Sequence, residues 1–278
     1  MKTLSAKSGA MIHMGSGWGC LEQLRRDADG EARLSTWYTY PESTLDAGQL
    51  PWLGLLRSGA MDVPDPMVAP IGYLVDPGWH KRLENAMEDP ANHSWFSWMH
   101  LGLMRYTAGD ISGALAAFEH SLEMEKSPWV LRNLAMLWGN ELHDLDKAVT
   151  YMDQAVASLA SNRWLWLDMA VLCLKADRLQ HWLTLYETVP ANIRQEGRLK
   201  LYTAMVLTRL NRLEEASEYL NYDLVVPDIT EDENSITEAW FALYGAIIQK
   251  RTGITDPDTL HQMVEKEYPL EKLDFRMQ

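Results

Sequence analysis

Basic residues are few and form no run in this sequence of 278 residues. Lysine and arginine number 25 against 39 aspartate and glutamate residues, for a formal net charge of −14. Because most of this surface would repel a phosphate backbone, we expect no nucleic-acid partner. Hydrophobic residues make up 47% of the chain, which excludes wholesale disorder and is ample for a core.

Cysteine is scarce too. The two cysteines, Cys20 and Cys173, lie far apart, and Cys173 sits within an apolar helical pattern. Two cysteines cannot form a zinc site alone, so we expect free thiols from a reducing compartment.

Long apolar runs are also missing. The longest, residues 164–174, is interrupted by Asp168 and is too short to cross a bilayer, but it is typical of a helix buried on all sides. The apolar stretch near the N-terminus, residues 10–14, is interrupted by His13 and forms no signal-peptide core. We therefore expect a soluble, cytoplasmic protein without a membrane partner.

Recognisable catalytic and metal-binding motifs are absent. The eight histidines are dispersed, with no HExxH spacing, and no serine or cysteine lies in a nucleophile elbow. The glycine-rich segment His13–Gly19 is either an anion-binding loop or, as we favour, a turn that holds Trp18. The acidic run within residues 228–233 lacks the glycine of an EF-hand, and helix capping explains it. We expect no catalytic site, no metal and no cofactor.

The sequence does contain an internal repeat, with a period of 34 residues. Its small-residue position holds alanine three times and tryptophan once: Ala114, Ala148, Trp182 and Ala216. Five residues before each of these stands a residue that easily adopts positive φ where a helix stops: Gly109, His143, Asp177 and Asn211. The pattern predicts helical hairpins, in which the small residue of the second helix lets the first helix approach closely.

The first helix of the first hairpin carries Trp98, Leu101 and Gly102. This W-x-x-L-G start, with its 34-residue period, resembles the tetratricopeptide repeat (TPR). We predict an all-α fold, a right-handed α-α superhelix or TPR solenoid, over residues 89–278, with about four repeats and a terminal capping helix pair. Because Trp182 is large for its position, the third repeat should be the most distorted.

Helix start and stop signals agree with this division. Ser127 followed by Pro128 predicts an N-cap and a first-turn proline, and Ser235 with Glu238 predicts a capping box. In the terminal pair, Gly253 should end the first helix, and residues 255–257 should open a last helix that runs to about residue 268.

Residues 1–88 do not repeat. They contain most of the glycine and proline, a possible strand at 32–40, and short helical pieces at 21–26, 51–57 and 79–87. We expect this small, irregular, partly β segment to pack on the solenoid.

In TPR proteins the first helix of each pair lines a concave groove, and the resemblance implies a groove here. Its expected residues are Phe96, Met99, Leu103, Tyr106, Trp129, Arg132, Asn133, Trp164 and Asp168. A helix surface with this many apolar side chains is normally covered by other protein atoms. We favour the chain's own N-terminal segment as the cover, and the alternative is a partner helix, a peptide or another protomer.

Asp168 is the single charge on the most apolar helix. Since an unpaired buried carboxylate is costly, it should have a cation or hydrogen-bond donors nearby. Arg132 and Asn133, at nearly equivalent positions of the preceding repeat, are the candidates. We favour a structural pair between repeats over a ligand contact.

Tryptophan is unusually abundant, with twelve residues. Most lie at helical core spacing, but four in the nonrepeating segment do not: Trp18, Trp37, Trp52 and Trp79. Exposed tryptophans stack well on sugar rings and bury well in interfaces.

Three stretches are similar to something more specific than a generic TPR. They are residues 13–22 (HMGSGWGCLE), residues 51–53 (PWL) and residues 227–241 (PDITEDENSITEAWF). They resemble the C-terminal half of a family of large bacterial proteins that join a galactose-mutarotase-like β-sandwich to a TPR array. The resemblance implies a bacterial, cytoplasmic and carbohydrate-related context and carries over no catalytic residue. The β-sandwich is not in this sequence, so we expect a stand-alone or split descendant, or part of a longer protein.

We predict a noncatalytic TPR scaffold that mediates protein–protein interaction. The alternative is the accessory part of a bacterial carbohydrate-active protein, with the four unexplained tryptophans lining a sugar site. The sequence leaves the partner and the oligomeric state open.

Overall fold

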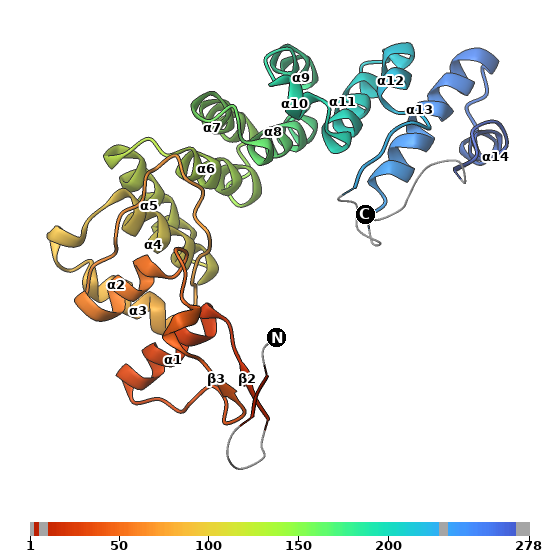
Figure 1. Cartoon of the computed structure of the whole chain (residues 1–278). Coiled ribbons are helices and arrows are strands. Elements are labelled where there is room, and N and C mark those ends of the chain that lie inside the picture. The colour runs from red at the N-terminus through yellow and green to blue at the C-terminus, as the bar shows by residue number, and fades with distance from the viewer. Residues whose placement is uncertain (1–2, 6–10, 228–232, 271–278) are drawn as a thin grey trace. The chain divides into compact units, whose positions relative to one another are not determined.

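The computed structural model describes the backbone of residues 3–5 and 11–14, and both backbone and side chains of residues 15–227 and 233–270. These residues form fourteen α-helices and one three-stranded sheet (Figure 1). The chain divides into two compact units, Met1–Leu137 and Trp138–Gln278. The predicted division at residue 88 stays a prediction, and the boundary between the two compact units falls within the sequence of α6 (Pro128–Asn140).

The first unit contains a small three-stranded sheet, of which the sequence predicted one strand. Strand β1 (Thr3–Ser5) runs antiparallel to β2 (Met11–Met14), which pairs in parallel with β3 (Tyr38–Thr39). The predicted strand at 32–40 is therefore wrong except for its residues 38 and 39, because only these have a strand partner. Helix α1 (Gly17–Asp29) is longer than the predicted 21–26 and ends at Gly30, which has φ 72°.

Two further helices of the nonrepeating segment confirm the predicted pieces. They are α2 (Leu50–Ser58) and α3 (Pro77–Ala86). Trp52 of α2 and Trp79 of α3 meet edge to face in the core, with ring centroids 5.8 Å apart. Helix α3 packs against α4 (Trp95–Thr107), so the nonrepeating segment lies on the first repeat.

Helix α4 pairs with α5 (Ile111–Met124) to form the first hairpin. The glycine of its W-x-x-L-G start is required by this close packing. A Cβ at Gly102 would lie 2.5 Å from the ring of Phe118 on α5.

The four turn residues predicted from the repeat are confirmed. Gly109, His143, Asp177 and Asn211 have φ of 83°, 54°, 55° and 57°. Among the described residues, the last three are the only non-glycine positions with positive φ. The chain therefore reverses direction at the same point of each repeat.

The second unit is a series of packed helices. They are α7 (Leu145–Ser158), α8 (Arg163–Lys175), α9 (Leu179–Tyr186), α10 (Ala191–Arg194), α11 (Gly197–Arg209), α12 (Leu213–Tyr219), α13 (Ser235–Thr252) and α14 (Pro257–Glu267). Helix α8 packs on α9 and α11, α11 packs on α12 and α13, and α13 packs on α14. The small-residue positions Ala148, Trp182 and Ala216 are all fully buried, as helical hairpins require.

The third repeat is irregular, and that it is the most distorted one stays a prediction. Its second helix, α9, has 8 residues where α7 has 14, and the short helix α10 follows it. Trp182 is fully buried, and its Nε1 donates a hydrogen bond to Oγ1 of Thr203, at 3.2 Å. The shortening is not confined to this repeat, since α12 has 7 residues.

Helix ends of the terminal pair were predicted in part. Gly253 ends α13 with φ 72°, and Asp256 caps α14 by accepting a hydrogen bond from the Thr259 amide at 2.9 Å, as expected. The capping box at Ser235 is wrong, because α13 begins one residue earlier than that motif requires. Asn234 is its N-cap, and the Ser235 hydroxyl donates to Glu233 instead.

Candidate interaction surfaces

The predicted groove residues of the first repeat fall into two groups. Phe96 and Met99 are 4% and 1% exposed and belong to the core, whereas Leu103 is half-buried and Tyr106 is 39% exposed. Phe96 packs against the imidazole of His100, and Trp52 of the nonrepeating segment packs against the same ring. The N-terminal segment thus covers part of this face of α4.

The predicted residues on α6 are half-buried. Trp129, Arg132 and Asn133 each retain some contact with solvent, as does Asp168 on α8. The predicted pairing of Asp168 with Arg132 or Asn133 stays a prediction.

In the second unit, one face of α8 keeps large apolar side chains in water. Trp164 is 55% exposed and Val171 is 45% exposed, with Asp168 between them. Their spacing of four and then three residues puts them on one helix face. The Arg163 guanidinium lies 4.4 Å from the centre of the Trp164 ring and pairs with Glu196 at 2.7 Å, which helps to orient the indole.

Within the second unit, basic residues at the C-terminal ends of α8 and α11 donate hydrogen bonds to the preceding repeat. Nζ of Lys175 donates to the Gly139 carbonyl at 3.0 Å, and Nη1 of Arg209 donates to the Leu174 carbonyl at 2.7 Å. Carbonyls at a helix C-terminus attract cations, so these residues tie one repeat to the next. They are structural parts of the array.

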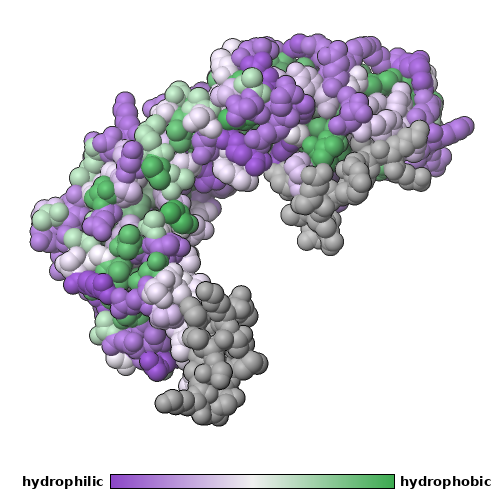
Figure 2. All heavy atoms as spheres, viewed as in Figure 1, coloured by the Kyte–Doolittle hydropathy of each residue, from purple (hydrophilic) through white to green (hydrophobic). Residues whose placement is uncertain are grey.

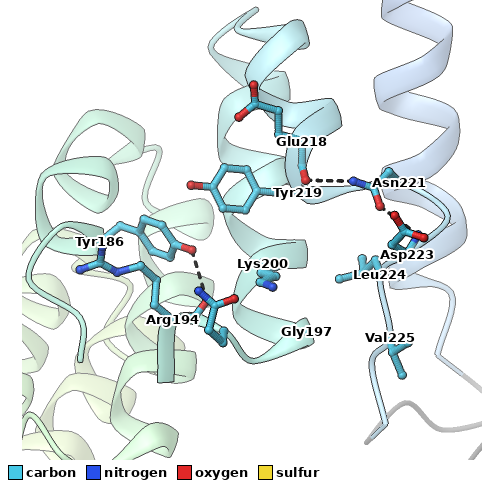
Figure 3. A pocket seen from close by; sticks show the side chains of 11 residues that line it. Tyr186, Arg194, Gly197, Lys200, Glu218, Tyr219, Asn221, Asp223, Leu224 and Val225 are labelled. Atoms are coloured by element: carbon cyan, nitrogen blue, oxygen red, sulfur yellow. Dashed lines mark hydrogen bonds between the residues drawn. The ribbon is translucent and has the colours of Figure 1, made fainter. Parts of the chain in front are cut away.

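A crevice with a volume of about 590 Å³ lies where the third and fourth repeats meet (Figure 3). Lys200 is among its lining residues. The rings of Tyr186 and Tyr219 meet edge to face at 5.8 Å, and these two tyrosines also line a separate pocket of about 480 Å³. The Tyr186 hydroxyl donates to the Arg194 carbonyl at 3.4 Å.

The wall of this crevice depends on a close backbone approach. A Cβ at Gly197 would lie 1.8 Å from the Val225 carbonyl oxygen, so only glycine lets residues 221–226 pack on the start of α11. Sequence periodicity missed this crevice, because its residues come from α9 to α12 and from the irregular segment after α12. Gly197 was the one residue in the sequence that could have indicated this crevice.

The four tryptophans considered for sugar stacking have different surroundings. Trp52 and Trp79 are each 1% exposed, and Nε1 of Trp79 donates to Glu22 at 3.0 Å, so neither offers a ring face to solvent here. Trp18 is half-buried, with its ring against Gly72. Trp37 is 69% exposed.

The loop at 59–76, between α2 and α3, also carries apolar residues at the surface. Val63, Val68, Ile71 and Tyr73 each expose more than half of their surface. The loop is anchored where the Ser127 hydroxyl donates to the Pro66 carbonyl at 3.1 Å. Apolar residues reach the visible surface over both units (Figure 2).

The two cysteines are free, as predicted, and both are buried. Burial raises the pKa of the Cys20 thiol, and burial together with the Asp153 carboxylate raises the pKa of Cys173 to about 12. Both thiols therefore stay protonated near neutral pH. Within residues 15–227 and 233–270, no group of histidine, cysteine, aspartate and glutamate is arranged to hold a metal ion.

In the glycine-rich segment 13–19, only residues 15 and 16 lie between β2 and α1, and the others belong to these two elements. The Gly15 amide donates to the Thr39 carbonyl at 2.9 Å, and Ser16 is the N-cap of α1. Most of the acidic run at 228–233 lies outside the described residues. Its last member, Glu233, pairs with Arg198 at 2.6 Å. None of the described helices combines the length and the apolar content that a membrane span needs.

No protein-family model matches the sequence, and no curated protein is significantly similar to it. Solved structures do match: a TPR protein from Parabacteroides merdae aligns with 70% of this chain and 81% of its own, at 17% identity and a TM-score of 0.50. The chain has the fold of TPR proteins. Two further matches are YrrB, described as a TPR protein with an unusual peptide-binding site (12% identity, 68% and 91% covered, TM-score 0.49), and pilF of Pseudomonas aeruginosa (16%, 69% and 83%, 0.48). At these identities the likeness concerns the TPR fold alone.

Proposed function

We propose that this chain is a noncatalytic TPR scaffold that binds a protein partner through the exposed face of α8. The observation that carries the proposal is the exposure of Trp164 and Val171 on one face of that helix. Exposed apolar side chains that share a helix face favour association, and tryptophan is enriched among the residues that dominate binding energy. The TPR fold supports the same reading, since its first helices present side chains for interaction.

The test compares retention of partners by the full chain and two variants. Trp164→Glu places a charge on the proposed face, and Met124→Glu makes the same change at another exposed apolar residue, on α5. We expect Trp164→Glu to lower retention of a specific protein from the native extract at least tenfold, while Met124→Glu leaves it unchanged.

Folding of both variants is checked by circular dichroism and thermal melting before retention is compared. Equal retention by the Trp164→Glu and Met124→Glu variants would contradict the proposal. So would loss of every partner by both, because nonspecific apolar contact would then explain the binding.

A second candidate function rests on Trp37. We propose as the alternative that this residue belongs to a sugar site of a carbohydrate-related bacterial protein, in keeping with the resemblance to the mutarotase-linked family. Its exposed indole and the neighbouring exposed Tyr38 support this reading, because aromatic faces stack on sugar rings. Tryptophan fluorescence titrated with mono- and oligosaccharides tests it, with Trp37→Phe as the matched variant. A flat response in the unmodified chain would exclude it.

A further inference from the structure

The imidazole of His100 is fully buried between the nonrepeating segment and the first repeat. Trp52 of α2 packs edge-on against it at a centroid distance of 4.8 Å, and Phe96 packs edge-on at 4.4 Å. Within the described part of the chain, neither ring nitrogen has a hydrogen-bond partner. A buried polar side chain without partners is rare, because desolvating it is not compensated.

Other histidines in the same unit are placed differently. Nε2 of His93 donates to the Met87 carbonyl at 2.9 Å, and Nε2 of His80 lies 3.4 Å from the Glu84 carboxylate. His100 is the imidazole of this region for which a charge brings only a penalty.

The charged side chains of the neighbouring helices are committed elsewhere. On α2, Arg57 pairs with Glu42 at 2.6 Å. On α3, Arg82 pairs with Asp29, while Glu84 also lies 3.9 Å from Arg105 of α4. Lys81 of α3 is exposed, and a cation would in any case disfavour a second positive charge. Burial by itself lowers the pKa of His100 to about 3.

The position of His100 links its protonation to a particular contact. Trp52, which covers the imidazole, is joined edge to face to Trp79 of α3, and α3 itself packs on α4. Water can reach the ring if these two helices move away from α4. A proton on His100 should therefore favour the separated arrangement, in which solvent can hydrate the imidazolium.

We propose that His100 is an acid-sensitive latch: its protonation releases α2 and α3 from the first repeat and uncovers the apolar face of α4 that carries Phe96 and Met99. This inference is independent of the α8 face, which lies in the other unit. In the released state, the N-terminal segment no longer covers the first repeat.

The direction and size of the effect follow from linkage. The pKa of His100 is about 3 in the closed state and about 6.5 once the ring is hydrated. The depressed value means that closure is fully favoured above pH 6.5 and loses its advantage as the pH falls. The opening constant should rise about 25-fold between pH 7 and pH 5.

Hydrogen exchange of the full chain measures this opening. Protection factors, which refer each exchange rate to the intrinsic rate at the same pH, are determined at pH 7 and pH 5. We expect protection in α2 and α3 to fall about 25-fold at pH 5 and protection in α13 to change much less. An equal fall in α13 would overturn the proposal, because general acid destabilisation would then explain it.

Two variants separate the latch from other titrations. His100→Leu should abolish most of the fall in α2 and α3, whereas His120→Leu, which removes an exposed imidazole, should retain it. A full acid response in His100→Leu would contradict the latch.

A second measurement does not depend on how the variant folds. The ring resonances of His100 in the unmodified chain should show no titration near pH 6.5 except in step with the opening of α2 and α3. Titration of the His100 ring near pH 6.5 while the amides of α2 and α3 stay protected from exchange would overturn the inference.

Discussion

At the scale of single residues, two glycines are packed differently in the first and in the last helix pair. Both lie in the middle of a first helix: Gly102 in α4 and Gly245 in α13. A Cβ at Gly102 would meet Phe118 at 2.5 Å, whereas a Cβ at Gly245 would meet nothing within 4 Å. The sequence could identify the first as part of the repeat signature, but the free space at the second depends on how α13 and α14 pack.

This difference predicts opposite signs for the same substitution. Gly102→Ala should lower the free energy of unfolding by about 1 to 2 kcal/mol, because overpacking against Phe118 outweighs the better helix propensity. Gly245→Ala should raise it by about 0.5 to 1 kcal/mol, since the methyl group meets no obstacle. Urea unfolding followed by circular dichroism measures both. Destabilisation by Gly245→Ala would show that the space beside α13 is filled.

At the scale of elements, the turns between paired helices show how local chemistry repeats. Each turn has a residue with positive φ, although only Gly109 is a glycine. A side chain in the left-handed region costs free energy, less for histidine, aspartate and asparagine than for branched residues. The turns therefore keep their geometry while they tolerate different residues.

The free-energy cost of positive φ predicts how substitutions at these turn positions change stability. Gly109→Ala should destabilise the chain by about 1 kcal/mol, because alanine must adopt the observed φ of 83°. His143→Gly should be neutral or stabilising by up to about 1 kcal/mol, as the strain is relieved at some loss of backbone entropy. Thermal melting of the two variants tests this pair. A marked loss of stability in His143→Gly would mean that its imidazole makes a contact that outweighs the strain.

At the scale of the whole molecule, the second compact unit holds a core of its own. In the second unit, one buried cluster joins α11, α12, α13 and α14, with Leu243 and Trp240 fully buried within it. Such helix pairs contact their neighbours in sequence, so stability is approximately a sum of repeat terms and nearest-neighbour interfaces. The effect of a core substitution should then be confined to nearby repeats.

Leu243→Ala tests this locality. We expect it to cost about 2 to 5 kcal/mol, from lost burial and the cavity left behind. Hydrogen-exchange protection should fall in α11 to α14 and hold in α4 and α5. A uniform fall across the chain would show instead that it unfolds as one cooperative unit.

The sequence by itself determined the features that recur at short range. The 34-residue period located the hairpins, and the residues tolerant of positive φ located the turns. These features were readable because helix formation and chain reversal depend on a few neighbouring residues. Burial of the small-residue positions followed from the same periodicity.

Only the tertiary structure decided the features that depend on contacts between distant residues. It paired two residues of the predicted strand with β2, placed the N-cap of α13 at Asn234 instead of Ser235, and buried Trp52 and Trp79 while leaving Trp37 and Trp164 in solvent. It also enclosed His100 without a partner and formed the crevice beside Tyr186. The physical reason is that exposure and pairing are properties of two surfaces in contact, and the second surface is not encoded near the first in the chain.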